Sequence, residues 1–413
     1  MPYSNRREFI KGVTGAATAA IVGGVGLVGA AGAQQAGAGR RREVRLGGPS
    51  MSGRGRRIKT IDIHTHVYVT EVLPLVEGRP WADFLRGRVK DAPNLYAFLP
   101  AGSPRGGGGV ARQRIQWMDD HGVDVQVLAM NPWWYFAERD ISNKLMSVQN
   151  EALAKMCAEF PGRFAALATC TLQHADLAAQ QLEEAFKKFG MRGAVIAGNV
   201  GGIELSSPKL DPFWAKAQEL EAFIFMHPQA EEGGFDGDSY PKEFYGRLAG
   251  PGGLNNVIGY PLETTIAFSH LIFGGVLDKF PGLRICGAHG AGFLPSYIGR
   301  SDASCLRPGT KCPDLKKRPS EYFREQLFCD SLVFNDAELR LRVDQFTASQ
   351  VVLGSDYPAA WPTRVVDHVL ETEGLTDAEK VAILGGNLSK YLGIPQFEVT
   401  DDDLKRRDSP TTN

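Results

Sequence analysis

Hydrophobic residues gather in eight short runs along the chain, and stretches with a different spacing separate these runs. Each run is too short for a helix, and most are apolar at every position, which is typical of strands buried on both faces. The runs are Lys59–Ile63, Val123–Ala129, Phe164–Thr169, Gly193–Ala197, Ala222–Met226, Arg284–Ala288, Leu327–Cys329 and Gln350–Gly354. We therefore predict eight buried strands.

Helical spacing fills the stretches between these runs. Asn150–Glu159 and Ala175–Phe189 repeat apolar residues at three- and four-residue intervals, and Glu263–Phe280 does the same before Pro281-Gly282. Strand and helix alternating eight times predict an α/β fold, a single-domain (β/α)8 TIM-type barrel. An open doubly wound sheet is the alternative. No GxGxxG pattern follows the first strand, which argues against its commonest dinucleotide-binding form.

The same pattern sets the expected domain boundaries. Residues 58–396 carry the barrel pattern, and residues 397–413 form a polar C-terminal tail. Residues 34–57, which contain many Gly, Gln, Arg and Ser, predict a flexible linker. Past residue 33 there is no long uncharged apolar run, so we expect no stable membrane insertion of the body.

Residues 1–33 have the organisation of an export signal. A basic start precedes an uncharged, Gly/Ala-rich run from Val13 to Ala33, which ends in a small-residue cleavage site. Arg6-Arg7 followed by Phe9-Ile10-Lys11 resembles the twin-arginine motif. This predicts export to the periplasm or the extracellular space. Because the uncharged run is 21 residues long, an N-terminal membrane anchor is the alternative.

Charge and cysteine usage narrow the function classes. The chain of 413 residues has a formal net charge of −1, but residues 1–45 carry +5 and the rest −6. An acidic body argues against nucleic-acid binding, which needs a basic face. The six cysteines form no CxxC pair, and Cys305 and Cys312 alone lie in a polar stretch where a disulfide is one interpretation.

Ionisable residues fall at the ends of the predicted strands. His64 and His66 follow the first strand, His227 the fifth and His289 the sixth, and Asp356 follows the eighth. The carboxyl ends of all strands in such a barrel open onto one face, where these enzymes place their chemistry. The five side chains are therefore expected to converge. For any single histidine, a packed or helix-capping role is the alternative.

This combination of side chains suits a divalent metal. Imidazole nitrogens from His64, His66 and His227 with the Asp356 carboxylate suit zinc, and manganese or ferrous iron would accept them too. His289 is then expected to stand beside the ion as an acid or base. Trp133 and Trp134, after the second strand, either line an apolar wall for a planar substrate or anchor the loop by burial.

Several segments resemble one branch of the amidohydrolase superfamily, the amidohydrolase-related or aminocarboxymuconate-semialdehyde decarboxylase-like family. The segments that carry the resemblance are Ile61-Asp62-Ile63-His64-Thr65-His66, Met226-His227-Pro228, Pro261–Ala267, Phe273–Pro281, Ala288–Pro295 and Gly354-Ser355-Asp356-Tyr357-Pro358. The resemblance covers residues 58 to 396. It implies a metal-dependent, non-oxidative decarboxylase of a small aromatic or dienoic carboxylic acid.

The resemblance also implies roles for individual residues. His64, His66, His227 and Asp356 match the family's metal ligands, His289 matches its catalytic histidine, and Asp356 shares in the proton transfer. Arg300 matches an arginine that reaches a neighbouring subunit's substrate carboxylate, which implies a homodimer or higher oligomer. The sequence departs from the family at Gln229, where a tryptophan is usual. A second substrate-binding arginine is not fixed by a motif, with Arg86 and Arg88 as candidates.

Two other functions stay open at this point. The same site could hydrolyse a lactone or amide, or hydrate a double bond, because the ligand set does not separate these reactions from decarboxylation. A catalytically dead exported binding protein is the third interpretation. It predicts the loss of some site residues, and all five are present.

Overall fold

Parallel strands close into a ring in the computed structural model, which describes residues 41–46, 56–79, 82, 107–132, 134–229, 247–248, 251–309, 314–359 and 361–396. The strands of the ring are β3 (Ile61–His66), β4 (Val125–Ala129), β5 (Phe164–Ala166), β6 (Ala168–Thr169), β7 (Gly193–Ile196), β10 (Phe223–Met226), β11 (Arg284–Gly287), β12 (Leu327–Asp330) and β13 (Val351–Val352). Each of these strands matches a predicted run, and the predicted barrel is confirmed.

Backbone hydrogen bonds join the two sheets of the ring. One sheet has the order β3-β4-β5 and the other the order β13-β12-β11-β10-β7-β6, with all pairs parallel. β5 and β6 are two parts of one strand, interrupted at Leu167, whose N–H still donates to Leu128 of β4. At the other seam Ile63 donates to Leu353 over 3.0 Å and Asp356 donates to His64 over 2.8 Å. The first and last strands are therefore neighbours.

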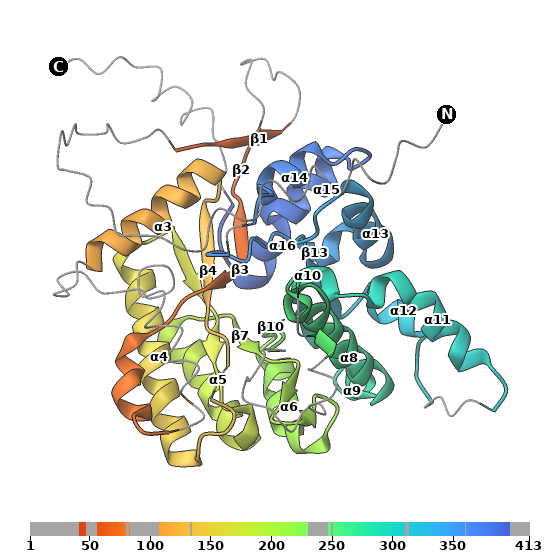
Figure 1. Cartoon of the computed structure of the whole chain (residues 1–413), viewed down its shortest axis with the longest axis horizontal. Coiled ribbons are helices and arrows are strands. Elements are labelled where there is room, and N and C mark those ends of the chain that lie inside the picture. The colour runs from red at the N-terminus through yellow and green to blue at the C-terminus, as the bar shows by residue number, and fades with distance from the viewer. Residues whose placement is uncertain are drawn as a thin grey trace. The chain divides into compact units, whose positions relative to one another are not determined.

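Helices follow the strands of the ring and lie around it (Figure 1). The main covering helices are α3 (Gly107–His121), α4 (Arg139–Glu159), α5 (Ala175–Phe189), α6 (Asp211–Glu219), α8 (Tyr260–Phe273), α11 (Leu294–Leu306), α13 (Asp336–Phe346) and α14 (Val365–Glu371). Shorter elements between them are η1 (Thr70–Val76), η5 (Asn255–Gly259), α9 (Val276–Lys279), α12 (Pro319–Tyr322), α15 (Asp377–Val381) and α16 (Asn387–Leu392). No helix in the described part of the chain has the length and apolar character needed to cross a bilayer.

Alternation along the strands explains why the runs are apolar throughout. In β10, Phe223 and Phe225 pack inside the ring, while Ile224 and Met226 pack between the strands and the helices. Both faces are thus buried, as a parallel barrel requires. The same alternation sets the site, since the inward position after Phe225 is His227.

The predicted helix over Glu263–Phe280 is two helices in the structure. α8 ends at Phe273, and Gly275, with φ +72°, precedes the short α9. A Cβ atom on Gly274 would lie 2.2 Å from the Ser206 Cβ, so this close approach requires glycine. The apolar spacing continues across the break because α8 buries Leu271 and Ile272 and α9 buries Val276 and Leu277.

Part of the segment predicted as a flexible linker is ordered. β1 (Val44–Leu46) pairs antiparallel with β2 (Arg56–Ile58), and ion pairs join this hairpin to the barrel. Arg41 pairs with Asp124, and Arg42 pairs with Asp367 of α14. These ion pairs connect the segment that leads into the hairpin to the barrel. The predicted export signal, residues 1–33, and the predicted tail, residues 397–413, lie outside the described residues.

The cysteines divide as their surroundings suggested. Cys170, Cys286 and Cys329 are free and buried, and Cys157 is free and half-buried. Burial raises the pKa of the Cys157 thiol to about 12, so it stays protonated and packs as a small apolar side chain. Cys305 is disulfide-bonded, whereas Cys312 lies outside the described residues.

Candidate metal centre

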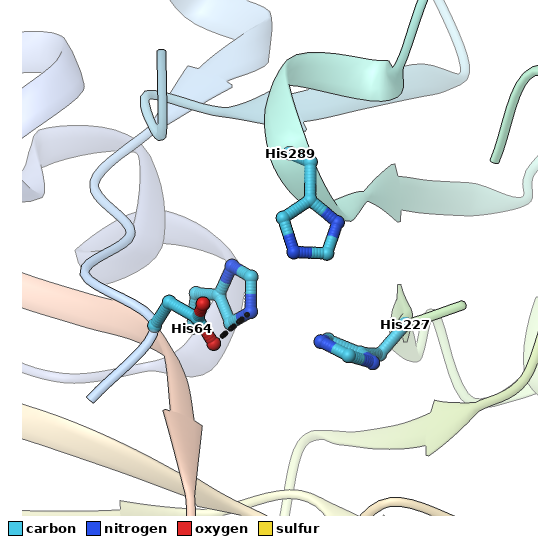
Figure 2. Close-up of side chains that lie close together, drawn as sticks. His64, His227 and His289 are labelled. Carbon is cyan, nitrogen blue, oxygen red and sulfur yellow. Dashed lines mark ion pairs between the residues drawn. The ribbon is translucent and has the colours of Figure 1, made fainter. Parts of the chain in front are cut away.

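Four side chains from separate strand ends meet inside the carboxyl end of the ring. His64, His227, His289 and Asp356 each offer one ligand atom, and these atoms lie within 4.8 Å of one another. Figure 2 shows the three imidazoles coming from different segments and pointing toward one another. His66 lies beside them, with its Nε2 2.8 Å from the Asp356 Oδ1 and its ring 4.7 Å from that of His227. All five predicted side chains are in one cluster.

A bulge in β3 brings two of these histidines to the interior. Ile61 and Ile63 already face the inside of the ring, so strict alternation would direct His64 and His66 outward. The pairing of β3 with β4 shifts register between Asp62 and Thr65. Such a bulge redirects the side chains that follow it. His64 and His66 lie on one face because they are alternate residues of the strand, and the bulge makes that face the inner one.

Hydrogen-bond acceptors outside the cluster bind the Nδ1 atoms of His64 and His227. The Nδ1 of His64 lies 2.6 Å from the Oδ2 of Asp330, and the Nδ1 of His227 lies 2.7 Å from the Pro228 carbonyl oxygen. A ring that donates from Nδ1 keeps a lone pair on Nε2, which is the form that binds a metal. Both rings therefore present Nε2 to the cluster.

Several buried polar atoms here have no hydrogen-bond partner. Among the described residues they include the Nδ1 of His66 and the Nδ1 of His289, and also the Nε2 of His64, which has an ion-pair contact with the Asp356 Oδ1 at 3.2 Å but no hydrogen bond. Buried polar atoms are normally satisfied, so three unsatisfied imidazole nitrogens in one cluster require an explanation. A divalent cation fits the donors of His64, His227, His289 and Asp356, because nitrogen and carboxylate ligands within this distance suit such an ion.

The electrostatics also favour a cation. Burial alone would lower the pKa of His64, but the carboxylates of Asp356 and Asp330 together raise it to about 10. A position that stabilises a proton this strongly also attracts a metal ion, which takes the proton's place on binding. Burial opposes ionisation of Asp356, yet the pKa of this carboxyl is well below its usual range because His64 and His66 are so near. Burial and the neighbouring His64 lower the pKa of His289 to about 4, so its ring is neutral at neutral pH.

Strained backbone carries two of the site residues. Asp356 has φ +61°, and His289 opens a turn in which four consecutive residues, through Gly292, have φ between +57° and +64°. Each non-glycine residue in this left-handed region costs about 1–2 kcal/mol. The short element α10 (Ala288–Ala291) is this turn rather than a regular helix. Strain of this kind persists only where the surroundings impose it.

Sequence reasoning missed two partners of the cluster. Asp330 is fully buried at the end of β12 and accepts from His64, and the indole N–H of Trp361 donates to the Oδ2 of Asp356 over 2.8 Å. Asp330 occupies the same strand-end position as the other site residues, so that register was a usable signal. Trp361 lies in a loop, where no pattern marks it.

Of the other predicted residues, the structure describes Trp134 and Arg300. Trp134 is buried, and its indole N–H donates to the Cys170 carbonyl, which is the loop-anchoring arrangement. Arg300 is exposed on α11. Trp133, Arg86 and Arg88 lie outside the described residues.

The barrel and its histidine–carboxylate cluster define a metal-binding enzyme of the TIM-barrel class. The amidohydrolase family model matches residues 61–394, and the chain belongs to that family. Over 285 residues it is 30% identical to the 2-amino-3-carboxymuconate-6-semialdehyde decarboxylase of Dictyostelium discoideum, covering 68% of this chain and 76% of that protein. It is 26% identical over 289 residues to a gamma-resorcylate decarboxylase of a Polaromonas species, covering 67% and 85%. The predicted class, a metal-dependent decarboxylase, is confirmed.

Solved structures agree with the fold. The 5-carboxyvanillate decarboxylase of Sphingomonas paucimobilis superimposes with a TM-score of 0.68 at 23% identity, covering 82% of this chain and all of that one. A dihydroxybenzoic acid decarboxylase of a Polaromonas species, solved with bound manganese, has a TM-score of 0.66 at 23% identity, covering 81% and 96%.

Proposed function

We propose that this protein catalyses the non-oxidative decarboxylation of a small aromatic or dienoic carboxylic acid. The observation that carries the proposal is the buried cluster of imidazoles and a carboxylate with unpartnered nitrogens. Relatives that are decarboxylases of such acids support the choice of reaction. A divalent cation held by His64, His227 and Asp356, with His66 beside them, would supply Lewis-acid stabilisation of negative charge on the substrate.

His289 is the group that we assign to proton transfer. When the bond to the carboxylate breaks, its electron pair stays on carbon, and that carbon takes a proton as carbon dioxide leaves. The half-buried, neutral imidazole of His289 can accept a proton from a substrate hydroxyl or water and deliver one to this carbon. Asp356 contacts both His64 and His66, so it keeps the negative charge of the site close to these rings.

Either zinc or manganese fits the donor set. Imidazoles with one carboxylate suit zinc by ligand type. The manganese bound in one solved relative supports manganese as the alternative to our sequence-based expectation of zinc. Metal analysis of protein expressed with each ion, followed by activity measured on metal-free protein reloaded with one ion at a time, decides between them.

A homodimer would bring Arg300 to a substrate carboxylate of the neighbouring subunit. Phe293 and Tyr297, which lie seven and three residues before Arg300 at helical spacing, are 38% and 64% exposed. Exposed aromatic residues beside an arginine are typical of interface surfaces. Light scattering gives the oligomeric state, and Arg300→Ala should raise KM without dissociating the oligomer. A monomer with full activity contradicts this part of the proposal.

We also propose export by the twin-arginine route to the periplasm or beyond. The support is the sequence of residues 1–33. Fractionation of cells that express the full chain tests it. An Arg6→Lys, Arg7→Lys variant should stay in the cytoplasm, and an unchanged distribution contradicts the route.

A screen of carbon dioxide release from aromatic and dienoic acids tests the reaction itself. His289→Ala should abolish turnover while bound metal stays near the wild-type level, and full activity in that variant contradicts the role of His289. One relative, a 2-keto-4-carboxy-3-hexenedioate hydratase of a Sphingobium species, is 23% identical over 326 residues. Hydration is therefore the second candidate, and substrate consumption without carbon dioxide release would favour it.

A further inference from the structure

The turn that carries His289 is unusual because every residue from His289 to Gly292 has positive φ. Two of these residues, His289 and Ala291, are not glycine and rarely adopt this conformation. The glycines also have no room for a side chain. A Cβ on Gly290 would lie 2.7 Å from the Val333 Cγ1, and one on Gly292 would lie 2.1 Å from the Pro261 carbonyl oxygen. Something outside the turn must therefore hold it in this shape.

Asp330 holds the turn from one side. Its Oδ2 accepts from the His289 N–H over 3.1 Å, and its Oδ1 accepts from the Gly290 N–H over 2.7 Å. The same Oδ2 lies 2.6 Å from the Nδ1 of His64. One fully buried carboxylate thus joins the backbone of His289 to the ring of His64.

Arg342 of α13 binds the carbonyl groups of the same turn. Its Nε donates to the Gly290 carbonyl and its Nη2 to the Gly292 carbonyl, each over 3.1 Å. The Arg342 side chain is buried, so water does not compete for these carbonyls. The Asp330 carboxylate therefore accepts from N–H groups of the turn, and the Arg342 guanidinium donates to its carbonyl groups.

We propose that Asp330 and Arg342 are positioning residues that clamp the left-handed turn and thereby aim the His289 imidazole at the cluster. Neither side chain needs to touch the substrate. Arg342 acts on His289 alone, because it binds carbonyls of the turn. Asp330 acts on both His289 and His64, so it couples the orientation of a catalytic group to that of a metal ligand. The part of this inference that concerns turnover rests on the proposed function, and the part that concerns the turn geometry does not.

Arg342→Met tests the clamp, because methionine fills part of the same space without donors. The expected result is a fall in kcat of about 10- to 100-fold, the range for a misplaced catalytic group, with KM and bound metal near wild type. Arg342→Lys should retain an intermediate kcat, since one ammonium group reaches one carbonyl. Arg340→Met is the matched control, because Arg340 lies on the same helix and donates to the Gly374 carbonyl instead. It should leave kcat unchanged.

Asp330→Asn separates the two halves of the clamp. The uncharged amide of this variant would accept more weakly from the Nδ1 of His64 and from the N–H groups of the turn. Both kcat and metal affinity should therefore fall, whereas Arg342→Met should lower kcat alone. Crystal structures of the metal-free variants report the φ of His289 independently of turnover. A folded, metal-loaded Arg342→Met with wild-type kcat overturns the inference, as does an unchanged turn in that variant. If wild-type protein releases no carbon dioxide, the proposed function fails, and the structures still decide whether the clamp sets the turn.

Discussion

Trp361 gives the sharpest test of how the cluster is tuned, because its side chain forms a hydrogen bond with the Asp356 carboxylate. Its indole N–H donates to the Oδ2 of Asp356 over 2.8 Å, and its ring packs against Phe334. Trp361→Phe removes the donor and keeps an aromatic ring. The carboxylate then loses one hydrogen bond that fixes its orientation toward His64 and His66.

The size of the effect follows from the kind of bond that is lost. A hydrogen bond to a charged group contributes about 1.5–3 kcal/mol when buried. Trp361 is half-buried, so water replaces part of the bond, and we expect a loss of about 1–2 kcal/mol. At 1.4 kcal/mol per factor of ten, the Kd for the metal ion rises roughly 5- to 30-fold. This agrees with the usual effect of losing an outer partner of a metal ligand.

Competition with a chromophoric chelator measures this Kd on metal-free protein titrated with manganese or zinc. Trp214→Phe in α6 is the matched control, because its indole N–H donates over 3.1 Å to the Leu205 carbonyl and not to a residue of the cluster. Urea unfolding shows that both variants are folded. A change below twofold in Trp361→Phe would refute the reasoning, and so would an equal change in Trp214→Phe.

Three further predictions follow from the described contacts. Removing the metal with a chelator should abolish activity and lower the unfolding temperature, and adding the ion back should restore both. The unfolding temperature changes because a ligand at 100 times its Kd stabilises the folded protein by about 2.7 kcal/mol. An unchanged unfolding temperature contradicts a bound cation. Gly292→Ala should lower the free energy of unfolding by about 2–4 kcal/mol, whereas Gly299→Ala, in α11 with nothing within 4 Å of its added Cβ, should raise it by about 0.5–1 kcal/mol. Asp124→Ala should lower the free energy of unfolding by about 2–4 kcal/mol, because the buried carboxylate accepts from the Thr60 N–H and pairs with Arg41 and Arg57. Asp367→Ala, at the more exposed pair with Arg42, should lower it by less than about 1 kcal/mol. Urea unfolding measures both losses, and equal losses contradict the argument.

The barrel was predictable because its signal is repeated many times. Apolar runs at both faces of every strand gave the strand positions to within a few residues, and the strand-end register brought together His64, His66, His227, His289 and Asp356. Asp330 carries the same register, but it lies in none of the segments that resemble the family, whereas Asp356 lies in Gly354-Ser355-Asp356-Tyr357-Pro358. Its function depends on contact with His64, which lies 266 residues away.

Other features depend on tertiary contacts that leave no local pattern. The bulge in β3 arises from its pairing with β4, and the left-handed turn at His289 arises from Asp330 and Arg342. The hairpin formed by β1 and β2 was predicted as a linker because its composition is polar and basic. Its order comes from acidic partners on the barrel, Asp124 and Asp367, which composition alone does not reveal.

The seam between β3 and β13 has a consequence for how the protein is made. His66 and Asp356 are 290 residues apart, so at about 5–20 residues per second the ribosome delivers the carboxylate roughly 15–60 s after the imidazole. Until then the nascent chain has the imidazoles of the site but lacks the Asp356 carboxylate, which is the anionic ligand. The ligand set is complete only after the last strand has joined the ring. A bound cation therefore stabilises the closed ring and does not stabilise a shorter folding intermediate to the same extent.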